Sequence, residues 1–391
     1  MFGIKRKTKH LISMLHNTIC NLAWEFSLYA VQLLPLQKKI VFNTWRGRGF
    51  CDEPKYILLE LLRQGVDAKY IWLVNDLNAE MPPQVKKVKY GSWLAMFHYT
   101  TAKIWIDNAK DSPKPRKRLG QFYLQTEHAC WGLKNSEQAE ETRLSTSYTN
   151  AVKIDASKTD LMYSNNECEK QKRENTFWYD GPVINTGSPS LAIVLNTPKE
   201  IMQKVHNTFD IHADTKIVIY APTFRNKFSA EVYIWDYERV IRALENRFGR
   251  EFVFLVRLHP NVATKELGLK YSSKIKDATF YLDTYELLAA SDVLITDMSS
   301  TMSFMAFAKK PVFLFAKDFD EYISSERSLS YPLEKLPFTM SRTVGELEKS
   351  IIAFDQKTYN DKCNTFMADI GFHDDGKGAE KICRILVRQL R

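Results

Sequence analysis

Side chains that bind anions follow three apolar stretches in the second half of the chain. The stretches 216–220, 252–257 and 293–296 have the branched, apolar residues of buried strands. The polar residues that end or follow them are Thr223, Arg225, Arg257, His259, Thr296, Asp297, Ser299 and Ser300. Hydroxyl, guanidinium and imidazole groups hold phosphate oxygens, and a helix that begins near Ser300 would add free backbone N–H groups. Each signal alone is more often a turn, a solvated charge or a helix cap, but their coincidence predicts a pyrophosphate site.

The first half carries a second group of polar residues around His128. A strand at 122–126 leads into a turn that contains His128, Gly132 and Lys134. This arrangement suits a general base beside an anionic ligand. The alternative is a histidine that only hydrogen-bonds within its own turn.

Another turn, at 43–52, connects the first strand to a helix. It carries Arg46 and Arg48 between glycines, and Asp52 is expected to be the N-cap of the helix. The turn lacks the spacing of a dinucleotide fingerprint or a Walker loop. We therefore expect neither NAD nor ATP.

The polar motifs lie between elements that alternate strand and helix. In the first half strands are expected at 39–44, 69–74, 103–107 and 122–126, with a helix at 53–64. A polar helical segment at 196–215 precedes a second series of strands, expected at 216–220, 252–257, 279–282, 293–296 and 311–315. This pattern predicts two doubly wound α/β domains in tandem, with ligands at the carboxyl ends of the strands.

Composition restricts the class of protein further. A chain of 391 residues with 45% hydrophobic and 26% charged residues is typical of a globular protein of two domains. The formal net charge of +9 favours an anionic partner, either nucleic acid, a membrane surface or a phosphorylated substrate. The six cysteines form no C-x-x-C pair, which indicates reduced thiols in a cytoplasmic protein. Asp318 and Asp320 resemble a metal-binding pair but fit a polar helix start better, so no metal is assigned.

The amino terminus combines a basic cluster at 5–9 with an apolar stretch at 11–36. Polar residues such as His16 and Glu25 interrupt the stretch, and no cleavage site follows it, so neither a transmembrane span nor a signal peptide is favoured. Two interpretations are equally supported: an amphipathic helix in the membrane interface, and a helix that packs on the protein's own core. The basic loop at 110–118 is a solvated loop or a contact for lipid phosphates.

Taken in order, the motifs resemble those of the CDP-glycerol glycerophosphotransferases of teichoic acid synthesis, from about residue 39 to the carboxyl terminus. The matching motifs are Gln-Thr-x-His at 125–128 followed by Lys134, Ala-Pro-Thr-x-Arg at 221–225, Arg-x-His-Pro at 257–260, Ile-Thr-Asp-x-Ser-Ser at 295–300 and Asp-Gly-Lys at 375–377. Two positions depart from the family pattern. The turn from His128 to Lys134 is longer than usual, and Ser190 stands where an arginine is common.

The resemblance implies a GT-B architecture of two Rossmann-like doubly wound domains with an N-terminal amphipathic helix. The expected division is a membrane-interface helix at 1–37, an acceptor-side domain at 38–195, a junction at 196–215 and a CDP-alcohol-binding domain with C-terminal helices at 216–391. The active site would lie in the cleft between the two domains.

The resemblance also implies roles for individual residues. His128 would be the base that deprotonates the acceptor hydroxyl, and His259 would join it in catalysis by stabilising the diphosphate as CMP leaves. The expected diphosphate-binding residues are Thr223, Arg225, Arg257, Thr296, Asp297, Ser299 and Ser300, with Asp297 orienting the turn. The expected acceptor-side residues are Arg46, Arg48 and Lys134.

The activity that the resemblance implies is transfer of glycerol phosphate, or a related polyol phosphate, from a CDP-alcohol to a lipid-linked acceptor of the undecaprenyl-diphosphate type. We expect a peripheral enzyme on the cytoplasmic face of the plasma membrane, with no nucleic acid partner and no tightly bound cofactor, and with a contribution from Mg²⁺ left open. The alternatives are a GT-B glycosyltransferase that uses a nucleotide-sugar, and a non-catalytic protein of the same fold that binds membranes or polyanions.

Overall fold

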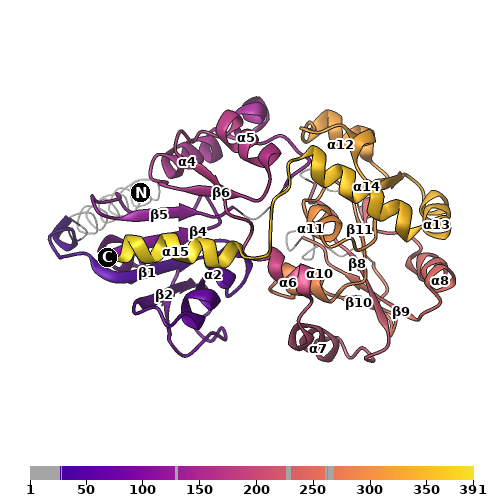
Figure 1. Ribbon diagram of the computed structural model, residues 1–391, viewed down its shortest axis with the longest axis horizontal. Helices are drawn as coiled ribbons and strands as arrows, with labels where there is room; N and C mark the ends of the chain where they lie inside the picture. Colours follow the sequence, from indigo (N-terminus) through magenta and orange to yellow (C-terminus); the bar gives the residue numbers. More distant parts are fainter. Residues whose placement is uncertain (1–26, 28, 128–130, 226–229, 260–261, 263–267) are drawn as a thin grey trace, which may run out of the picture.

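Two parallel sheets, each covered by helices, lie side by side along the long axis of the molecule (Figure 1). The structure is a computed structural model, and it describes all residues except 1–26, 28, 128–130, 226–229, 260–261 and 263–267. The basic cluster and most of the expected N-terminal helix therefore lie outside the described residues. Within the described part of the chain, no helix is long and apolar enough to cross a bilayer.

The first sheet has five strands in the order β3-β2-β1-β4-β5, and all neighbouring pairs are parallel. Its strands are β1 (Gln37–Asn43), β2 (Lys69–Val74), β3 (Val85–Lys89), β4 (Ala102–Asp107) and β5 (Phe122–Gln125). The strands are apolar on both faces because both faces are covered, as a parallel sheet requires.

The helices on the first sheet include one from the far end of the chain. They are α2 (Asp52–Arg63), α3 (Trp93–Thr101) and α15 (Gly378–Leu390). Ile382 and Leu386 of α15 share a core with Leu58 of α2 and Trp72 of β2. The sequence-based division placed 216–391 in the second domain. This is wrong for α15, because its apolar residues pack in the core of the first domain.

A smaller layer flanks the first sheet. Its elements are η1 (Glu137–Arg143), α4 (Thr146–Ala156), β6 (Met162–Ser164), α5 (Glu167–Thr176) and β7 (Val183–Asn185). The strands β6 and β7 pair in parallel, and a bridge between Leu124 and Leu161 attaches the layer to β5. The layer carries Lys172 and Arg173 on α5 toward the cleft between the domains.

The second sheet has six parallel strands in the order β10-β9-β8-β11-β12-β13. Its strands are β8 (Lys216–Tyr220), β9 (Phe252–Val256), β10 (Ile275–Asp277), β11 (Val293–Thr296), β12 (Val312–Phe315) and β13 (Thr339–Ser341). The strand expected at 279–282 is wrong. The structure has β10 at Ile275–Asp277 instead, and the chain bends after it. At the bend, the carbonyl oxygens of Ala278 and Tyr281 accept hydrogen bonds from Arg257.

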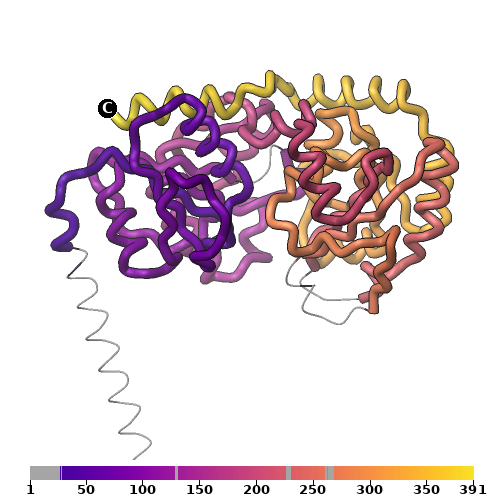
Figure 2. The backbone as a smooth tube through the Cα atoms, turned by 90° about the horizontal axis from the view of Figure 1, so that it is seen from below, coloured from indigo at the N-terminus to yellow at the C-terminus, as the bar shows by residue number. Residues whose placement is uncertain are grey.

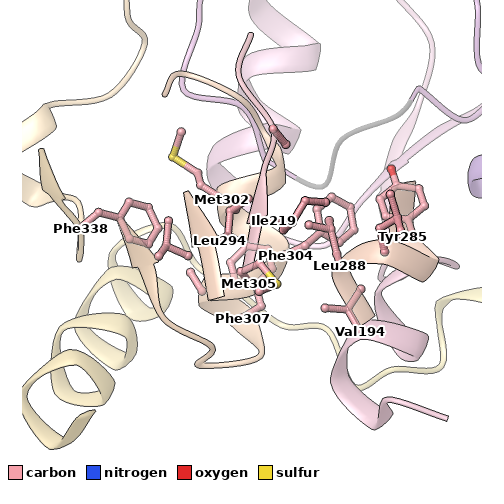
Figure 3. Close-up of a cluster of buried hydrophobic side chains, with 14 of the residues drawn as sticks. Val194, Ile219, Tyr285, Leu288, Leu294, Met302, Phe304, Met305, Phe307 and Phe338 are labelled. Carbon is pink, nitrogen blue, oxygen red and sulfur yellow. The ribbon is translucent and has the colours of Figure 1, made fainter. Parts of the chain in front are cut away.

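Helices cover both faces of the second sheet. They are α6 (Leu191–Asn196), α7 (Lys199–Thr208), α8 (Tyr237–Phe248), α10 (Thr284–Ala290), α11 (Thr301–Phe307), α12 (Phe319–Ser325), α13 (Val344–Ile352) and α14 (Gln356–Asp369), with short turns at η2 (Ala230–Val232) and η3 (Leu333–Lys335). Figure 3 shows one of the cores, where Ile219 and Leu294 of the sheet pack with Leu288 and Phe304 of α10 and α11.

The C-terminal segment joins the two domains. It runs along one side of both, with α14 on the second domain and α15 on the first (Figures 1 and 2). The crossing is tightly held, because a Cβ atom at Gly378 would lie 2.6 Å from the carbonyl carbon of Gly187. Asp374 accepts a hydrogen bond from the backbone of Ser188 at 2.6 Å. These contacts set the orientation of the domains on either side of the cleft.

Candidate active site

A cavity of about 410 Å³ lies between the two domains at the carboxyl ends of β8, β9 and β11. The first domain contributes Trp45, Arg48, Cys51, Asp52 and Lys134 to its wall, and the second contributes residues that include Thr223, Phe224, Arg257, His259, Asp283, Ser299 and Ser300. Because parallel strands end at one edge of a sheet, residues far apart in sequence meet here. The cavity brings together seven predicted residues: Arg48, Lys134, Thr223, Arg257, His259, Ser299 and Ser300.

Hydrogen bonds to the segment after β8 fix the turn after β11. Thr296 is buried and donates through Oγ1 to the carbonyl oxygen of Ala221 at 2.7 Å. Asp297 is also buried, and its Oδ1 accepts hydrogen bonds from the backbone N (2.9 Å) and Oγ1 (2.6 Å) of Thr223. Neither Thr296 nor Asp297 lines the cavity. They fix the segments after β8 and β11 to each other and leave Ser299 and Ser300 facing the cavity.

Arg225 does not line this cavity, contrary to the expectation that it contacts a diphosphate. Its guanidinium donates to both carboxylate oxygens of Asp318 (2.7 and 2.9 Å) and to Asp297 Oδ2 (2.8 Å), and it lies over the ring of Tyr322. Burial lowers the pKa of Arg225, but the hydrogen bonds and charges of the two aspartates outweigh this and raise it above the ordinary value. We assign Arg225 to positioning the wall of the cavity.

Arg257 and His259 end β9 at the cavity. Arg257 donates to the carbonyl oxygen of Tyr281 (2.6 Å) and to Thr284 Oγ1 (2.7 Å), and no described carboxylate pairs with it. Burial and then the charge of Arg48 lower the pKa of Arg257 to about 10, so it stays cationic at neutral pH. Burial also lowers the pKa of His259, followed by the charges of Arg48 and Arg257, which favours a neutral imidazole at pH 7.

The carboxyl groups of the cavity wall are neutralised or paired. Burial, followed by the nearby charge of Glu53, raises the pKa of Asp52 to about 8, so this carboxyl is mostly protonated at pH 7. Asp283 accepts a hydrogen bond from Lys55 at 2.6 Å. The cavity therefore presents cationic groups and hydroxyls to a ligand, a combination that suits a diphosphate.

Several predicted residues lie elsewhere. Arg46 is on the surface and donates through Nε to Asp111 at 2.8 Å, outside the cavity. His128 falls outside the described residues. Asp52 is the first residue of α2 and Cys51 is the N-cap residue, so the expected N-cap role of Asp52 is wrong.

Other positions singled out in the sequence have structural roles. Ser190 is buried and donates to Glu53 at 2.5 Å, so this position supports the start of α2. Asp318 pairs with Arg225, whereas Asp320 pairs with Arg342, so the two aspartates point to different partners. Among the described residues, no group of three His, Cys, Asp or Glu side chains could hold a metal ion.

Sequence reasoning missed two kinds of residue in the site. Trp45 and Phe224 form aromatic parts of the cavity wall. Each is adjacent in sequence to a predicted polar residue, Arg46 or Thr223. Lys55 and its partners Asp283 and Glu286 brace the cleft, but the lysine and Asp283 are 228 residues apart in sequence. Trp45 and Phe224 could have been predicted, because they lie within the turns that follow strands. The ion pairs of Lys55 could not, because its partners are distant in sequence.

Two Rossmann-like domains with a cleft between them, and a cationic cavity at the strand ends of the second, define a protein of the GT-B fold class. The sequence model of the CDP-Glycerol:Poly(glycerophosphate) glycerophosphotransferase family matches residues 27–388. The chain belongs to this family, which confirms the predicted family and the predicted fold class. The N-terminal amphipathic helix stays a prediction.

Named relatives agree with this assignment. The chain is 25% identical to a teichoic acid poly(glycerol phosphate) polymerase of Staphylococcus epidermidis, over 90% of this chain and 51% of that protein. It is 26% identical to a teichoic acid glycerol-phosphate transferase of Staphylococcus aureus, over 96% of this chain and 100% of that protein. The chain thus spans about half of the first relative and the whole of the second. A structure of the wall teichoic acid polymerase TagF superposes with a TM-score of 0.81 at 25% identity, covering 97% of each chain.

Proposed function

We propose that this chain transfers glycerol phosphate from CDP-glycerol to an acceptor hydroxyl and releases CMP. Family membership supports the reaction class, and TagF crystals were soaked with CDPG. The observation that carries the proposal is the cavity in which Arg257, His259, Ser299 and Ser300 converge from the ends of two strands, β9 and β11. Related polyol phosphates differ only in the length of the alcohol, so the same cavity suits them.

The proposed chemistry is an in-line displacement at the phosphorus that bears the glycerol. The acceptor oxygen forms a bond to this phosphorus while the bond to the CMP oxygen breaks. Arg257, His259 and the two serine hydroxyls bind the diphosphate and stabilise the charge that develops on CMP. His128 is the proposed base that accepts the proton of the attacking hydroxyl, on the strength of the motif at 125–128.

We propose a lipid-linked acceptor and a site of action on the cytoplasmic face of the plasma membrane. An exposed apolar surface supports a membrane contact: Leu33 is 88% exposed, and Leu34 and Leu119 are also exposed. The two segments lie next to each other, because Arg118, beside Leu119, donates to the carbonyl oxygen of Leu34 at 2.8 Å. The guanidinium of Arg118 supplies positive charge at this surface, which favours anionic lipid headgroups.

The transfer reaction is tested by CMP release from CDP-glycerol in the presence of lipid-linked saccharide acceptors. We expect CMP from CDP-glycerol or CDP-ribitol and no release of UDP from UDP-sugars. Ser300→Ala should lower kcat/KM by about tenfold to hundredfold, because it removes one hydroxyl from the diphosphate site. Ser324→Ala, an exposed serine on α12, is the matched control. Turnover of UDP-sugars alone would support a sugar transferase and overturn the proposal.

A further inference from the structure

A cavity of about 370 Å³ lies in the first domain, at the amino ends of the strands and away from the candidate active site. Gln37 and Lys69, the first residues of β1 and β2, line it. The candidate active site lies beyond the other end of the same strands, where Trp45 follows β1. A strand rises about 3.3 Å per residue, so the two cavities are roughly 20 Å apart. The proposed reaction therefore does not account for this cavity.

The register of the first sheet places three lysines on one of its faces. Lys39 of β1 is the register partner of Lys69 of β2. Lys86 of β3 is the partner of Ile71, which lies two residues beyond Lys69. Register partners point to the same face of a sheet, and so do side chains two residues apart in a strand. All three lysines line the cavity, which we call the lysine cavity, on the face where Ile71 packs with Tyr99 of α3.

The three lysines have no carboxylate partner among the described residues, whereas the buried side chain of Lys114 pairs with two carboxylates. Lys39 is only 2% exposed, and its Nζ donates to Thr101 Oγ1 at 2.6 Å. Burial, followed by the charges of Lys69 and Lys86, lowers the pKa of Lys39 to about 8, so most of it stays cationic at pH 7. The lysines repel one another, and an anion placed among them would relieve this repulsion.

His98 of α3 is a buried polar residue of the same cavity, with an exposed fraction of 6%. Neither Nδ1 nor Nε2 has a hydrogen-bond partner in the described part of the chain, although buried polar groups normally have one. Burial, followed by the charges of Lys39 and Lys86, lowers the pKa of His98 to about 4. The ring is therefore neutral at pH 7, and one of its nitrogens carries a donor N–H. A ligand with an acceptor oxygen would satisfy this donor.

We propose that the lysine cavity binds a phosphate group, held by the three lysines and His98. Lysine binds phosphate oxygens as a point charge, and the imidazole adds a directed N–H donor. A phosphate monoester offers three acceptor oxygens and up to two negative charges, so it can contact several of these groups at once. Two sources have this chemistry: free phosphate in solution and the headgroup of a lipid. The exposed Leu34 lies three residues before Gln37, at most about 11 Å along the chain, which places the cavity beside the proposed membrane contact.

An NMR titration of the full chain with inorganic phosphate tests the site through the ring signal of His98. The chain has eight histidines, and His98→Phe identifies the signal by its loss. The site variant combines Lys69→Gln and Lys86→Gln, because both side chains are exposed and their loss should leave the fold intact. The matched control combines Lys38→Gln and Lys87→Gln, which removes the same charge from the opposite face of β1 and β3. We expect a saturable shift whose midpoint rises at least about tenfold in the site variant and changes less than about twofold in the control.

Flotation with phosphatidylcholine vesicles that contain phosphatidic acid distinguishes the two sources. If a lipid headgroup is the ligand, the site variant should float severalfold less than the control variant. If the two variants float equally while inorganic phosphate still moves the His98 signal, the ligand is phosphate in solution. An unmoved signal together with equal flotation would overturn the site. Equal midpoints in the two variants, or the same shift with chloride at equal ionic strength, would also overturn it.

Discussion

A buried ion cluster between the domains makes the sharpest prediction about the fold. Lys55 of α2 has a side chain that is only 8% exposed, and its Nζ lies 2.6 Å from Asp283 Oδ2 and 2.6 Å from Glu286 Oε1. Tyr56 also donates to Asp283, at 2.8 Å. Burial lowers the pKa of Lys55, but the charges of Asp283 and Glu286 outweigh this and raise it. The cluster joins the two domains beside the cavity of the candidate active site.

The cost of removing this lysine can be worked out from the geometry. At an effective dielectric constant of about 20, unit charges 2.6 Å apart attract by roughly 6 kcal/mol. Two such attractions are offset by several kcal/mol of desolvation for each buried ion. Lys55→Met removes the attractions, leaves Asp283 buried without a cation and leaves Glu286 with only Lys204. We expect the free energy of unfolding to fall by about 3–5 kcal/mol.

Glu286 provides a matched control. Lys204 pairs with the same carboxylate at 2.8 Å, but its side chain is 57% exposed. Lys204→Met should therefore cost no more than about 1 kcal/mol. Urea unfolding followed by circular dichroism measures both values. The electrostatic reasoning fails if Lys55→Met costs less than about 1 kcal/mol, or no more than Lys204→Met.

Two further predictions concern pH and membranes. Burial and the charge of Lys39 lower the pKa of His98 to about 4, below its ordinary 6.5, so the unfolded state binds more protons between these values and stability falls as the pH drops through this window. His98→Phe should abolish a loss of about 2 kcal/mol between pH 7 and pH 5, and an unchanged pH slope in urea unfolding would contradict this. Replacing Leu33 and Leu119 by serine should reduce flotation with anionic vesicles by severalfold, whereas serine at the exposed Leu59 of α2 should not, and equal flotation of all three proteins would refute the membrane contact.

Local patterns in the sequence were enough to predict that much of one wall of the candidate active site comes together. The strands β8, β9, β11 and β12 of the second sheet are short runs of mainly apolar residues, and parallel strands deliver the residues beyond their carboxyl ends to one edge. This places Arg257, His259, Ser299 and Ser300 together without any knowledge of distances. The strand expected at 279–282 failed because alternation alone cannot show that the bend after β10 is held by Arg257.

The sequence could not predict which charged residues remain available to a ligand. Arg225 looked like a diphosphate ligand, but Asp318, 93 residues later, folds against its guanidinium. Asp52 looked like an ordinary cap, but burial makes it a largely neutral acid. Ion pairing and burial depend on contacts between distant segments, for which a single sequence carries no periodic signal.

The sequence by itself determined the family, the two α/β domains and the polar turns that follow the strands, because these depend on residue types at short spacing. Only the tertiary structure decided how the domains are joined, with α15 returning to the first domain and Lys55 paired across the cleft. It also brought Lys39, Lys69 and Lys86 into one cavity with His98. The physical reason is that hydrophobic periodicity is a property of a single helix or strand. The arrangement of charges in a cleft depends instead on how all the helices and strands pack together.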